Sequence, residues 1–352
     1  MQDVLHKTLI IRLSSVGDVV LSSPLVRSLR GRFPDCRIDY VVKSAYADLV
    51  RHNPYVDSVI EFPDAGTAAD LLRLRRTIAA SGYDLIIDIH DSIRSRFLCA
   101  GMRRVVRLNK RKIARWLLVR FKIDTYGRFG GAPAVAERYL ETLGAWGVRD
   151  HGRGLELFVP DTIRETVDAL LAGENIPKTA RCIGVCPSAK HANKMWPEER
   201  FAMAAGVLAA QEGDPVLLFG SADERERCAT IATIIASSFP GTHVVNLAGW
   251  TSLLETAAVM DHCAVVIAND TGLMHIAVAR GTQVVALFGP TVRQFGFFPP
   301  AARSTVIEVT GLGCRPCTHI GLPRCPEGHF LCMNAIQVDT VVAAARRRME
   351  GG

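Results

Sequence analysis

Short apolar runs rich in β-branched residues alternate with longer helical patterns along the whole chain of 352 residues. A strand followed by a helix can lie parallel to the next strand, so this alternation predicts parallel sheets with helices on both faces. The expected strands fall into two series. The first comprises residues 8–13, 37–42, 58–62 and 84–89, and the second comprises residues 182–187, 215–220, 243–248, 264–269 and 283–289.

The two series predict an α/β chain with one doubly wound parallel sheet in each half. We expect an N-terminal domain over residues 1–160 and a C-terminal domain over residues 161–335, joined by a linker rich in Gly, Pro and charge. Residues 336–352 are expected to form a C-terminal helix, with packing back on the N-terminal domain as one arrangement. Because 49% of the residues are hydrophobic, the chain can fill two such cores, which excludes intrinsic disorder.

The formal charge of +7 is unevenly distributed, with +9 in residues 1–160 and −2 in residues 161–352. Such a basic half favours an anionic partner or substrate. No apolar run reaches the roughly 18–20 residues that span a bilayer. Arg12 and Asp18 interrupt the N-terminal run before a signal peptide can form. We therefore expect a cytoplasmic protein with no transmembrane segment.

The loop after the first strand is the first candidate site, because ligands of open parallel sheets bind beyond the carboxyl ends of the strands. This loop is a tight turn that places the carboxylate of Asp18 where the next helix begins. Asp18 is interpreted either as a cap of that helix or as a general base. The small residues Ser15 and Gly17 leave room there for a substrate.

The loop after the strand 182–187 contains Ser188 and Lys194 and is followed by a helix that Pro197 begins. Lysine charges near a helix N-terminus add to its unpaired amides and its dipole, so this loop predicts an anion site. A solvated basic loop is the alternative.

The loop after the strand 264–269 supplies a second anion-binding element. Thr271 and Gly272 open the next helix, so their amides can face a diphosphate, and His275 lies one turn further on the same face. Asp270 would accept hydrogen bonds from sugar hydroxyls, because a carboxylate repels phosphate. Alone this motif is also typical of a capped helix, but together with the lysine loop it predicts a nucleotide-diphosphate site.

The loop from Gly220 to Arg225 places Asp223 at a helix start. Asp223 either complements the helix dipole or binds ribose hydroxyls. The chain has no G-x-x-x-x-G-K-[ST] motif and no G-x-G-x-x-G motif after the first strand. P-loop enzymes, kinases and ordinary dehydrogenases therefore lose support.

Five segments together resemble glycosyltransferase family 9, the ADP-heptose:lipopolysaccharide heptosyltransferases. They are IIRLSSVGDVVLSSPLVRSLR, YDLIIDIHDSIRS, AKHANKMWPEERF, LAGWTSLLETAAVM and ANDTGLMHIAVARGTQVVALFGPT. The resemblance implies a GT-B architecture, in which two Rossmann-like domains face each other across a cleft. It places the nucleotide sugar on the C-terminal domain and the acceptor on the N-terminal domain.

The resemblance also implies an inverting, metal-independent transfer of L-glycero-D-manno-heptose from ADP-heptose, with no further cofactor. The acceptor would be the inner core of lipopolysaccharide, either Kdo-lipid A or heptosyl-Kdo-lipid A. The family's base corresponds to Asp18, and its leaving-group lysine corresponds to Lys194. The donor-binding set is then Ser188, Lys194, Asp223, Asp270, Thr271, Gly272 and His275.

Other functions remain open at this point. No residue of these motifs reads the base or the sugar directly, so a GT-B glycosyltransferase that uses another nucleotide sugar on an anionic glycolipid is an alternative. A nucleotide-gated binding protein without turnover is another, although the carboxylate of Asp18 in a substrate loop favours catalysis.

Residues 92–128 contain twelve basic residues and one acidic residue. The alternatives are a solvated face, a nucleic-acid site with Trp116, Phe121 and Tyr126 as stacking residues, and an anionic lipid site. No nucleic-acid motif accompanies the segment, and ARWLLVRFK is typical of a helix on an anionic surface. The resemblance favours an anionic lipopolysaccharide precursor and a protein peripheral to the inner membrane. The expected acceptor-binding residues are Ser15, Gly17, His90, Arg94 and Arg96.

Four cysteines near the C-terminus, Cys314, Cys317, Cys325 and Cys332, have only one pair with zinc-ribbon spacing. A structural metal site is weighed here against ordinary buried or surface thiols. The expected transfer chemistry requires no metal ion.

Overall fold

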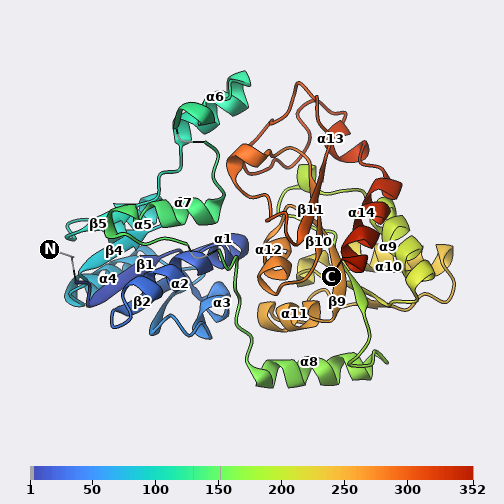
Figure 1. Cartoon of the computed structure of the whole chain (residues 1–352), viewed down its shortest axis with the longest axis horizontal. Helices are drawn as coiled ribbons and strands as arrows, with labels where there is room; N and C mark the ends of the chain where they lie inside the picture. Colours follow the sequence, from blue (N-terminus) through green and yellow to red (C-terminus); the bar gives the residue numbers. More distant parts are fainter. Residues whose placement is uncertain (1–3, 130, 151, 352) are drawn as a thin grey trace. The chain divides into compact units, whose positions relative to one another are not determined.

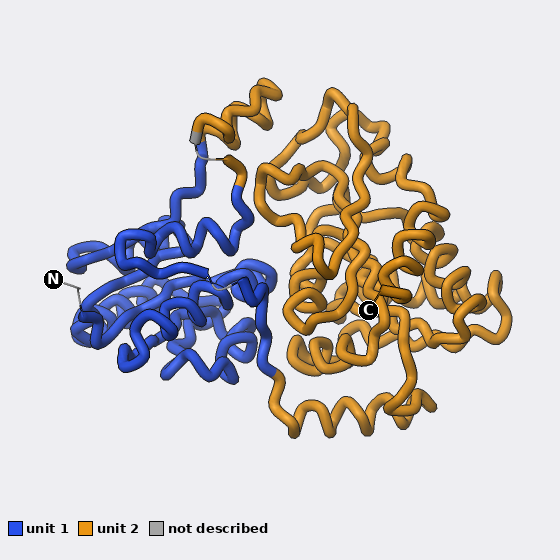
Figure 2. Tube along the Cα trace, viewed as in Figure 1, with its two compact units in different colours: residues 1–112, 133–158 blue, residues 113–132, 159–352 orange. Residues whose placement is uncertain are grey.

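The structure is a computed structural model that describes residues 4–129, 131–150 and 152–351, and the chain divides into two compact units (Figure 2). The first unit takes in residues 1–112 and 133–158, and the second takes in residues 113–132 and 159–352. Each unit is built on one parallel sheet (Figure 1).

The first unit contains a five-stranded sheet of strand order β3-β2-β1-β4-β5. Leu9 and Ile11 point to one face of the sheet, where they pack with Leu74 of one helix and Leu98 of another. On the opposite face the hydroxyl of Tyr40 shares a 2.8 Å hydrogen bond with Ser22. The strands are β1 (Lys7–Ile11), β2 (Arg37–Lys43), β3 (Ser58–Phe62), β4 (Leu85–Asp88) and β5 (Val105–Arg107). The helices are α1 (Val16–Val20), α2 (Ser23–Arg32), α3 (Asp48–Arg51), α4 (Ala68–Ala80), α5 (Ile93–Leu98) and α7 (Val135–Glu141).

The second unit contains a six-stranded sheet of strand order β11-β10-β9-β6-β7-β8. Its strands bury β-branched residues on both faces, as parallel strands between two helical layers do. The strands are β6 (Cys182–Cys186), β7 (Val216–Leu218), β8 (Val244–Asn246), β9 (Cys263–Asn269), β10 (Val284–Phe288) and β11 (Ser304–Glu308). The helices are α6 (Lys112–Phe121), α8 (Asp161–Gly173), α9 (Glu198–Glu212), α10 (Arg225–Ser238), α11 (Leu253–Met260), α12 (Gly272–Ala279), α13 (Leu331–Asn334) and α14 (Val338–Glu350).

The two doubly wound parallel sheets expected from the sequence are confirmed, and all nine expected strands are present. The structure adds β5 and β11, which end the two strand orders. The first has only three residues, and the second mixes Ser, Thr and Glu with two apolar residues. Neither gives the sustained apolar run by which buried strands are found in a sequence.

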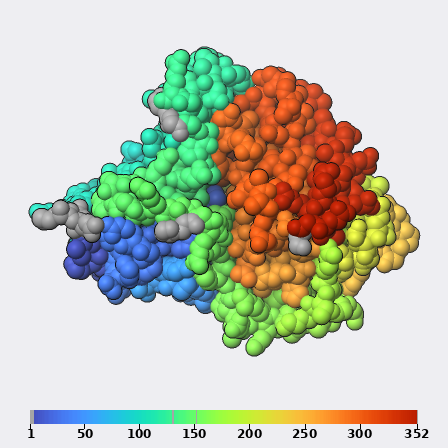
Figure 3. All heavy atoms as spheres, in the orientation of Figure 1, coloured from blue at the N-terminus to red at the C-terminus, as the bar shows by residue number. Residues whose placement is uncertain are grey.

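The domain limits expected from the sequence differ from the structure in two places. Residues 113–132 belong to the second unit, because Ala114 and Leu118 of α6 pack with Phe295. The helix α14, red in Figure 3, packs in the second unit, where Val341 and Ala345 complete the core beside α9. Packing of α14 on the N-terminal domain stays a prediction.

None of the described helices is both long enough and apolar enough to cross a bilayer.

The glycine in the middle of α9 tests this core. A Cβ at Gly206 would overlap the ring of Phe239, whereas a Cβ at Gly173, the last residue of α8, would meet nothing within 4 Å. We predict that Gly206→Ala lowers the free energy of unfolding by about 1–3 kcal/mol through overpacking. The control Gly173→Ala should be neutral or slightly stabilising. Equal denaturation midpoints for the two variants would contradict this packing.

Candidate functional site

The strand order of the first sheet reverses beside β1. The chain passes from β1 to β2 and β3 on one side, and then returns to β4 on the other side. Ligands of doubly wound sheets bind at such a reversal, beyond the carboxyl ends of the strands. Arg12 lies in the loop after β1, and Asp18 lies in the first turn of α1, which follows that loop. His90 lies in the loop after β4. The first candidate site is therefore at the ligand-binding edge of this sheet.

Arg12 holds the carboxylate of Asp18 in a largely buried ion pair. Its Nη2 lies 2.5 Å from Asp18 Oδ2, and the two side chains are 9% and 19% exposed. Arg12 Nη1 also donates a hydrogen bond to the carbonyl oxygen of Ile89, at 2.7 Å. The hydroxyl of Tyr139 donates to Asp18 Oδ1 at 3.2 Å, and its ring lies 5.7 Å from the Arg12 guanidinium. One ion pair thus joins the ends of β1 and β4 to α1 and α7.

Asp18 also caps α1, as one interpretation of the sequence expected. The Ser15 hydroxyl and backbone amide donate to Asp18 Oδ2 at 3.1 and 3.4 Å. Burial would raise the pKa of Asp18, but the charge of Arg12 and the hydrogen bonds from Arg12 and Ser15 outweigh it, so the pKa lies below its usual range. The carboxylate is therefore ionised at neutral pH, which a general base requires. Capping and proton transfer are compatible roles.

His90 follows β4 and is held neutral. Burial, together with the charges of Arg12 and Lys110, lowers the pKa of His90 to about 3. Its ring Nδ1 is buried and has no hydrogen-bond partner among the described residues. Because buried polar atoms are nearly always paired in native structures, this nitrogen is available to a bound ligand.

The other expected acceptor residues lie around this loop. Gly17 is buried in α1, and Ser15 precedes it on the surface. Arg94 is exposed, and its charge contributes to the low pKa of His90. Arg96 differs, because its guanidinium lies 2.7 Å from the carboxylate of Asp91. To bind an acceptor, Arg96 would therefore have to release Asp91 or contact both.

The second sheet reverses in the same way beside β6, with β7 on one side and β9 on the other. Asn269, the last residue of β9, joins the two central loops. Its Nδ2 donates to the carbonyl oxygen of Pro187 at 2.7 Å, and its Oδ1 accepts from the Trp196 amide at 3.1 Å. The Trp196 side chain is fully buried. These contacts fix both ends of the lysine loop expected to bind an anion.

Lys194 and Asp270 form an ion pair at this reversal. Lys194 Nζ lies 2.5 Å from Asp270 Oδ2, and the two side chains are 12% and 7% exposed. The hydroxyl of Thr291 donates to the same oxygen at 2.9 Å. The Asp270 carboxylate, which the sequence suggests as an acceptor for sugar hydroxyls, thus positions the lysine. An ammonium has three donors, so Lys194 can hold Asp270 and still bind a phosphate.

The N-terminus of α12 adds backbone donors to this site. Thr271 is the N-cap, and Gly272 is the first residue of the helix. The first amides of a helix have no partner within it and favour anions. Ser188 Oγ is buried and has no hydrogen-bond partner within the described part of the chain. His275 is also buried, with its ring 6.4 Å from that of Phe297.

Asp223 is exposed in a short 3-10 helix, η5 (Ala222–Glu224). The capping contact here comes from Glu224, whose Oε2 accepts from the Ser221 amide at 2.7 Å. Capping therefore does not require Asp223, and ribose binding by its carboxylate stays a prediction.

Four residues at the two sites are not among the candidates from the sequence. Arg12 and Asn269 carry a signal, since each is a polar residue at the end of a buried strand. Tyr139 and Thr291 have no such signal in the sequence, because they lie 121 and 21 residues from the carboxylates that accept their hydrogen bonds.

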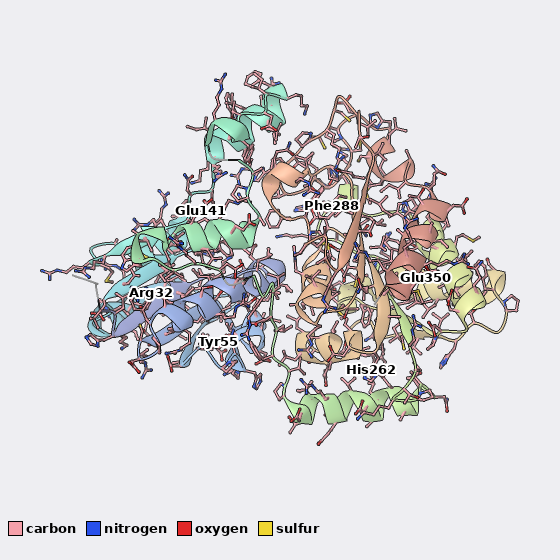
Figure 4. All side chains as sticks on the ribbon, viewed as in Figure 1. Arg32, Tyr55, Glu141, His262, Phe288 and Glu350 are labelled. Atoms are coloured by element: carbon pink, nitrogen blue, oxygen red, sulfur yellow. The ribbon has the colours of Figure 1, made fainter. Side chains whose placement is uncertain are left out.

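The basic segment 92–128 has more counter-charges than its own sequence provides. Carboxylates from outside the segment, those of Asp88, Asp91 and Glu141, pair with four of its cations. The pairs are Arg96 and Lys112 with Asp91, Arg107 with Asp88, and Arg111 with Glu141 at the end of α7 (Figure 4). Its excess charge is thus smaller in the folded chain than in the sequence.

Burial and the neighbouring Cys317, Cys325 and Cys314 raise the pKa of Cys332 to about 11, so the four C-terminal cysteines lie near one another. No group of three or more His, Cys, Asp or Glu side chains could hold a metal ion in the part of the chain that the structure describes. Instead, Asn193 Nδ2 lies 3.9 Å from Cys317 Sγ, and Asn193 Oδ1 accepts from the Leu322 amide at 2.8 Å. The segment that contains these cysteines therefore holds Asn193, the residue before Lys194, in place.

Comparison with known proteins supports the family resemblance. The model of the family described as glycosyltransferase family 9 (heptosyltransferase) matches residues 71–325. Lipooligosaccharide heptosyltransferase 2 of Haemophilus influenzae is 30% identical over 318 residues, which cover 86% of this chain and 88% of that protein.

Solved structures share the fold over nearly the whole chain. A glycosyl transferase family 9 protein from Veillonella parvula matches with a TM-score of 0.81 at 22% identity, over 99% of this chain and 98% of that one. The ADP-heptose lps heptosyltransferase II of E. coli matches with a TM-score of 0.72 at 23% identity, over 98% and 99%. The expected GT-B fold class is confirmed. Phe288, which is labelled in Figure 4, is the last residue of β10, the strand beside the edge strand β11.

The ion pair of the first site gives a pH-dependent prediction. In the wild type the folded-state pKa of Asp18 is lowered, so its contribution to stability is present above the unfolded value of about 3.9 and is lost as the pH falls through the folded value. Arg12→Met leaves a buried carboxylate whose pKa burial raises. We expect a loss of about 3–5 kcal/mol in unfolding free energy at neutral pH, which shrinks on acidification.

The matched control is the double variant Arg12→Met with Asp18→Asn, which removes both charges and should unfold at a lower cost than Arg12→Met alone. Denaturant titrations at several pH values measure the unfolding free energies of the wild type, the single variant and the double variant. A pH-independent loss within the range of an exposed pair, about 0–1 kcal/mol, would show that Asp18 does not depend on Arg12.

Proposed function

Because this chain belongs to glycosyltransferase family 9, we propose that it transfers L-glycero-D-manno-heptose from ADP-heptose to the inner core of lipopolysaccharide. One observation carries the proposal. The base candidate Asp18 and the phosphate-binding candidate Lys194 each occupy the reversal point of a doubly wound sheet, where such sheets bind ligands. Each unit would supply one half of the reaction.

The second unit is proposed to bind ADP-heptose. Lys194, held by Asp270, would contact the diphosphate together with the amides of Thr271 and Gly272. These donors are fixed before the reaction, so they can stabilise the negative charge that develops on ADP as it leaves. The unpaired Ser188 hydroxyl is a further donor. We propose a transfer without a metal ion or another cofactor, in which Lys194 supplies the cationic charge.

The first unit is proposed to bind the acceptor and activate it. The acceptor hydroxyl loses its proton to an Asp18 oxygen while its own oxygen attacks the anomeric carbon from the face opposite ADP. The bond from that carbon to the phosphate oxygen breaks, and ADP leaves with the electron pair. Such a single displacement inverts the anomeric centre. Because Arg12 lowers the pKa of Asp18, proton transfer would occur late, when attack has made the hydroxyl acidic.

The neutral ring of His90 and the exposed charge of Arg94 are proposed to orient the acceptor. Kdo carboxylates and lipid A phosphates on such an acceptor would complement the basic half of the chain. We therefore propose that the enzyme acts on the cytoplasmic side, peripheral to the inner membrane. Whether Kdo-lipid A or heptosyl-Kdo-lipid A is preferred is decided by assay of each.

The role of Asp18 can be separated from donor binding. Asp18→Asn is expected to keep the thermal stabilisation by ADP and to lose about 10²–10⁴-fold in turnover, because the amide cannot accept the proton. The variant also leaves the Arg12 charge without its carboxylate, so it should unfold more easily than the wild type. Transfer assays with ADP-heptose and defined core acceptors measure this loss. Turnover close to that of the wild type would exclude Asp18 as the base.

The donor site predicts a nucleotide preference and a role for one lysine. ADP should raise the melting temperature, whereas UDP and GDP should not. Lys194→Met should weaken ADP binding by about 1.5–3 kcal/mol, the range for hydrogen bonds to charged groups. Lys190→Met, which removes an exposed lysine from the same loop, is the control. Stabilisation by UDP and not by ADP would instead favour a transferase for another nucleotide sugar.

A further inference from the structure

Exposed apolar side chains gather at α6, which Figure 3 draws in teal at the surface. Twelve large apolar side chains are exposed among the described residues, and four of them lie within eleven positions. These four are Ile113, Trp116, Phe121 and Ile123, with exposed fractions of 69%, 58%, 51% and 52%. Single exposed apolar residues are ordinary, but such a concentration marks a binding surface.

The opposite side of α6 is fixed to the second unit. Ala114 and Leu118 are buried against Tyr126 and Phe295. Lys122 Nζ closes the carboxyl end of the helix by donating to the carbonyl oxygens of Val119 and Pro316, at 2.9 and 2.6 Å. The exposure of the four apolar side chains is therefore not due to a helix that lacks packing contacts. Ile113, Trp116 and Phe121 belong to an anchored helix whose outer face is uncovered within its own unit, and Ile123 follows the end of that helix.

Aromatic and cationic groups alternate on that outer face. The rings of Trp116 and Phe121 meet edge to face with centroids 5.1 Å apart, and the Arg120 guanidinium lies 5.6 Å from the Phe121 ring. The Lys112 side chain is 57% exposed, although its ammonium lies 3.4 Å from the carboxylate of Asp91. No Asp or Glu occurs between residues 92 and 123. The face is thus apolar and cationic, without a carboxylate of its own.

We infer that α6 docks on the surface of an anionic lipid bilayer, with Trp116 and Phe121 as its apolar anchors. Amphipathic helices of this composition lie in the plane of the interface, with apolar side chains among the acyl chains and cations at the headgroups. Ten residues cannot span a bilayer but suffice to lie on one. The inference deepens the proposed function, because a lipid-linked acceptor would be presented at that surface.

A nucleic-acid site fits the same surface less well. Bases stack on open ring faces, whereas the Trp116 and Phe121 rings pack against each other and Arg120 covers Phe121. Ile113 and Ile123 offer a base neither a ring face nor a hydrogen bond. All four side chains have a role at a bilayer.

Co-sedimentation of the full chain with vesicles tests the inference. The probes are vesicles of phosphatidylcholine alone and of phosphatidylcholine mixed equally with phosphatidylglycerol. The wild type should bind the mixed vesicles and lose binding in high salt, because cation attraction is screened. Trp116→Ser combined with Phe121→Ser should bind at least about tenfold more weakly, since two anchors are lost. Arg120→Gln should weaken binding to the mixed vesicles only.

Matched variants separate this face from general surface changes. Trp250→Ser removes a tryptophan that is 68% exposed elsewhere, and Arg347→Gln removes an exposed arginine of α14. Both should bind vesicles as the wild type does. Retained thermal stabilisation by ADP shows that the double variant is folded. The inference would be overturned if the wild type did not bind the mixed vesicles, or if it bound an RNA oligonucleotide instead. It would also be overturned if the double variant bound the mixed vesicles as tightly as the wild type.

Failure of this inference and failure of the proposed transfer give different results. Vesicle binding is measured without substrates, so it can be present in a protein that transfers no heptose. If transfer occurs, the double variant should keep its turnover with a deacylated, water-soluble acceptor and lose it with an acceptor embedded in mixed vesicles. Equal losses with both acceptors would contradict a membrane role for α6.

Discussion

A buried arginine determines the state of the carboxylate on which the first site depends. Without Arg12, burial would favour the neutral form of Asp18, and a protonated acid cannot accept a proton from a hydroxyl. Tyr139 and Ser15 add hydrogen bonds that fix the direction of the carboxylate. The Arg12 hydrogen bond to Ile89 also links this carboxylate to the loop that carries His90. The rest of the first site is arranged around this ion pair.

The second unit also has a buried ion pair at its site, but there the anion positions the cation. There the carboxylate of Asp270 positions the cation, and Lys194 is the group that would meet the substrate. Both ion pairs lie where a parallel sheet reverses its strand order, so each is buried on one side by the sheet and faces the ligand-binding edge on the other. A buried pair is costly to break, which keeps each functional charge in place.

The sequence predicts both sheets and the loops of both sites, because apolar periodicity and loop position are local properties. Asp270 is found in this way directly after β9, whereas Asp18 and Lys194 are found further along the segments that follow β1 and β6. Tyr139 is not, since its contact with Asp18 exists only once α7 packs on the sheet. The membership of residues 113–132 in the second unit also escapes prediction, because it depends on packing against Phe295, far along the chain.

We have proposed that the chain transfers a heptose from ADP-heptose by single displacement. The most direct measurement is the mass and the anomeric configuration, by nuclear magnetic resonance, of the product formed from ADP-heptose and a Kdo-lipid A or heptosyl-Kdo-lipid A acceptor. We expect the addition of one heptose with the anomeric configuration opposite to that of the donor. A product that retains the configuration of the donor, or no product from either acceptor, would contradict it.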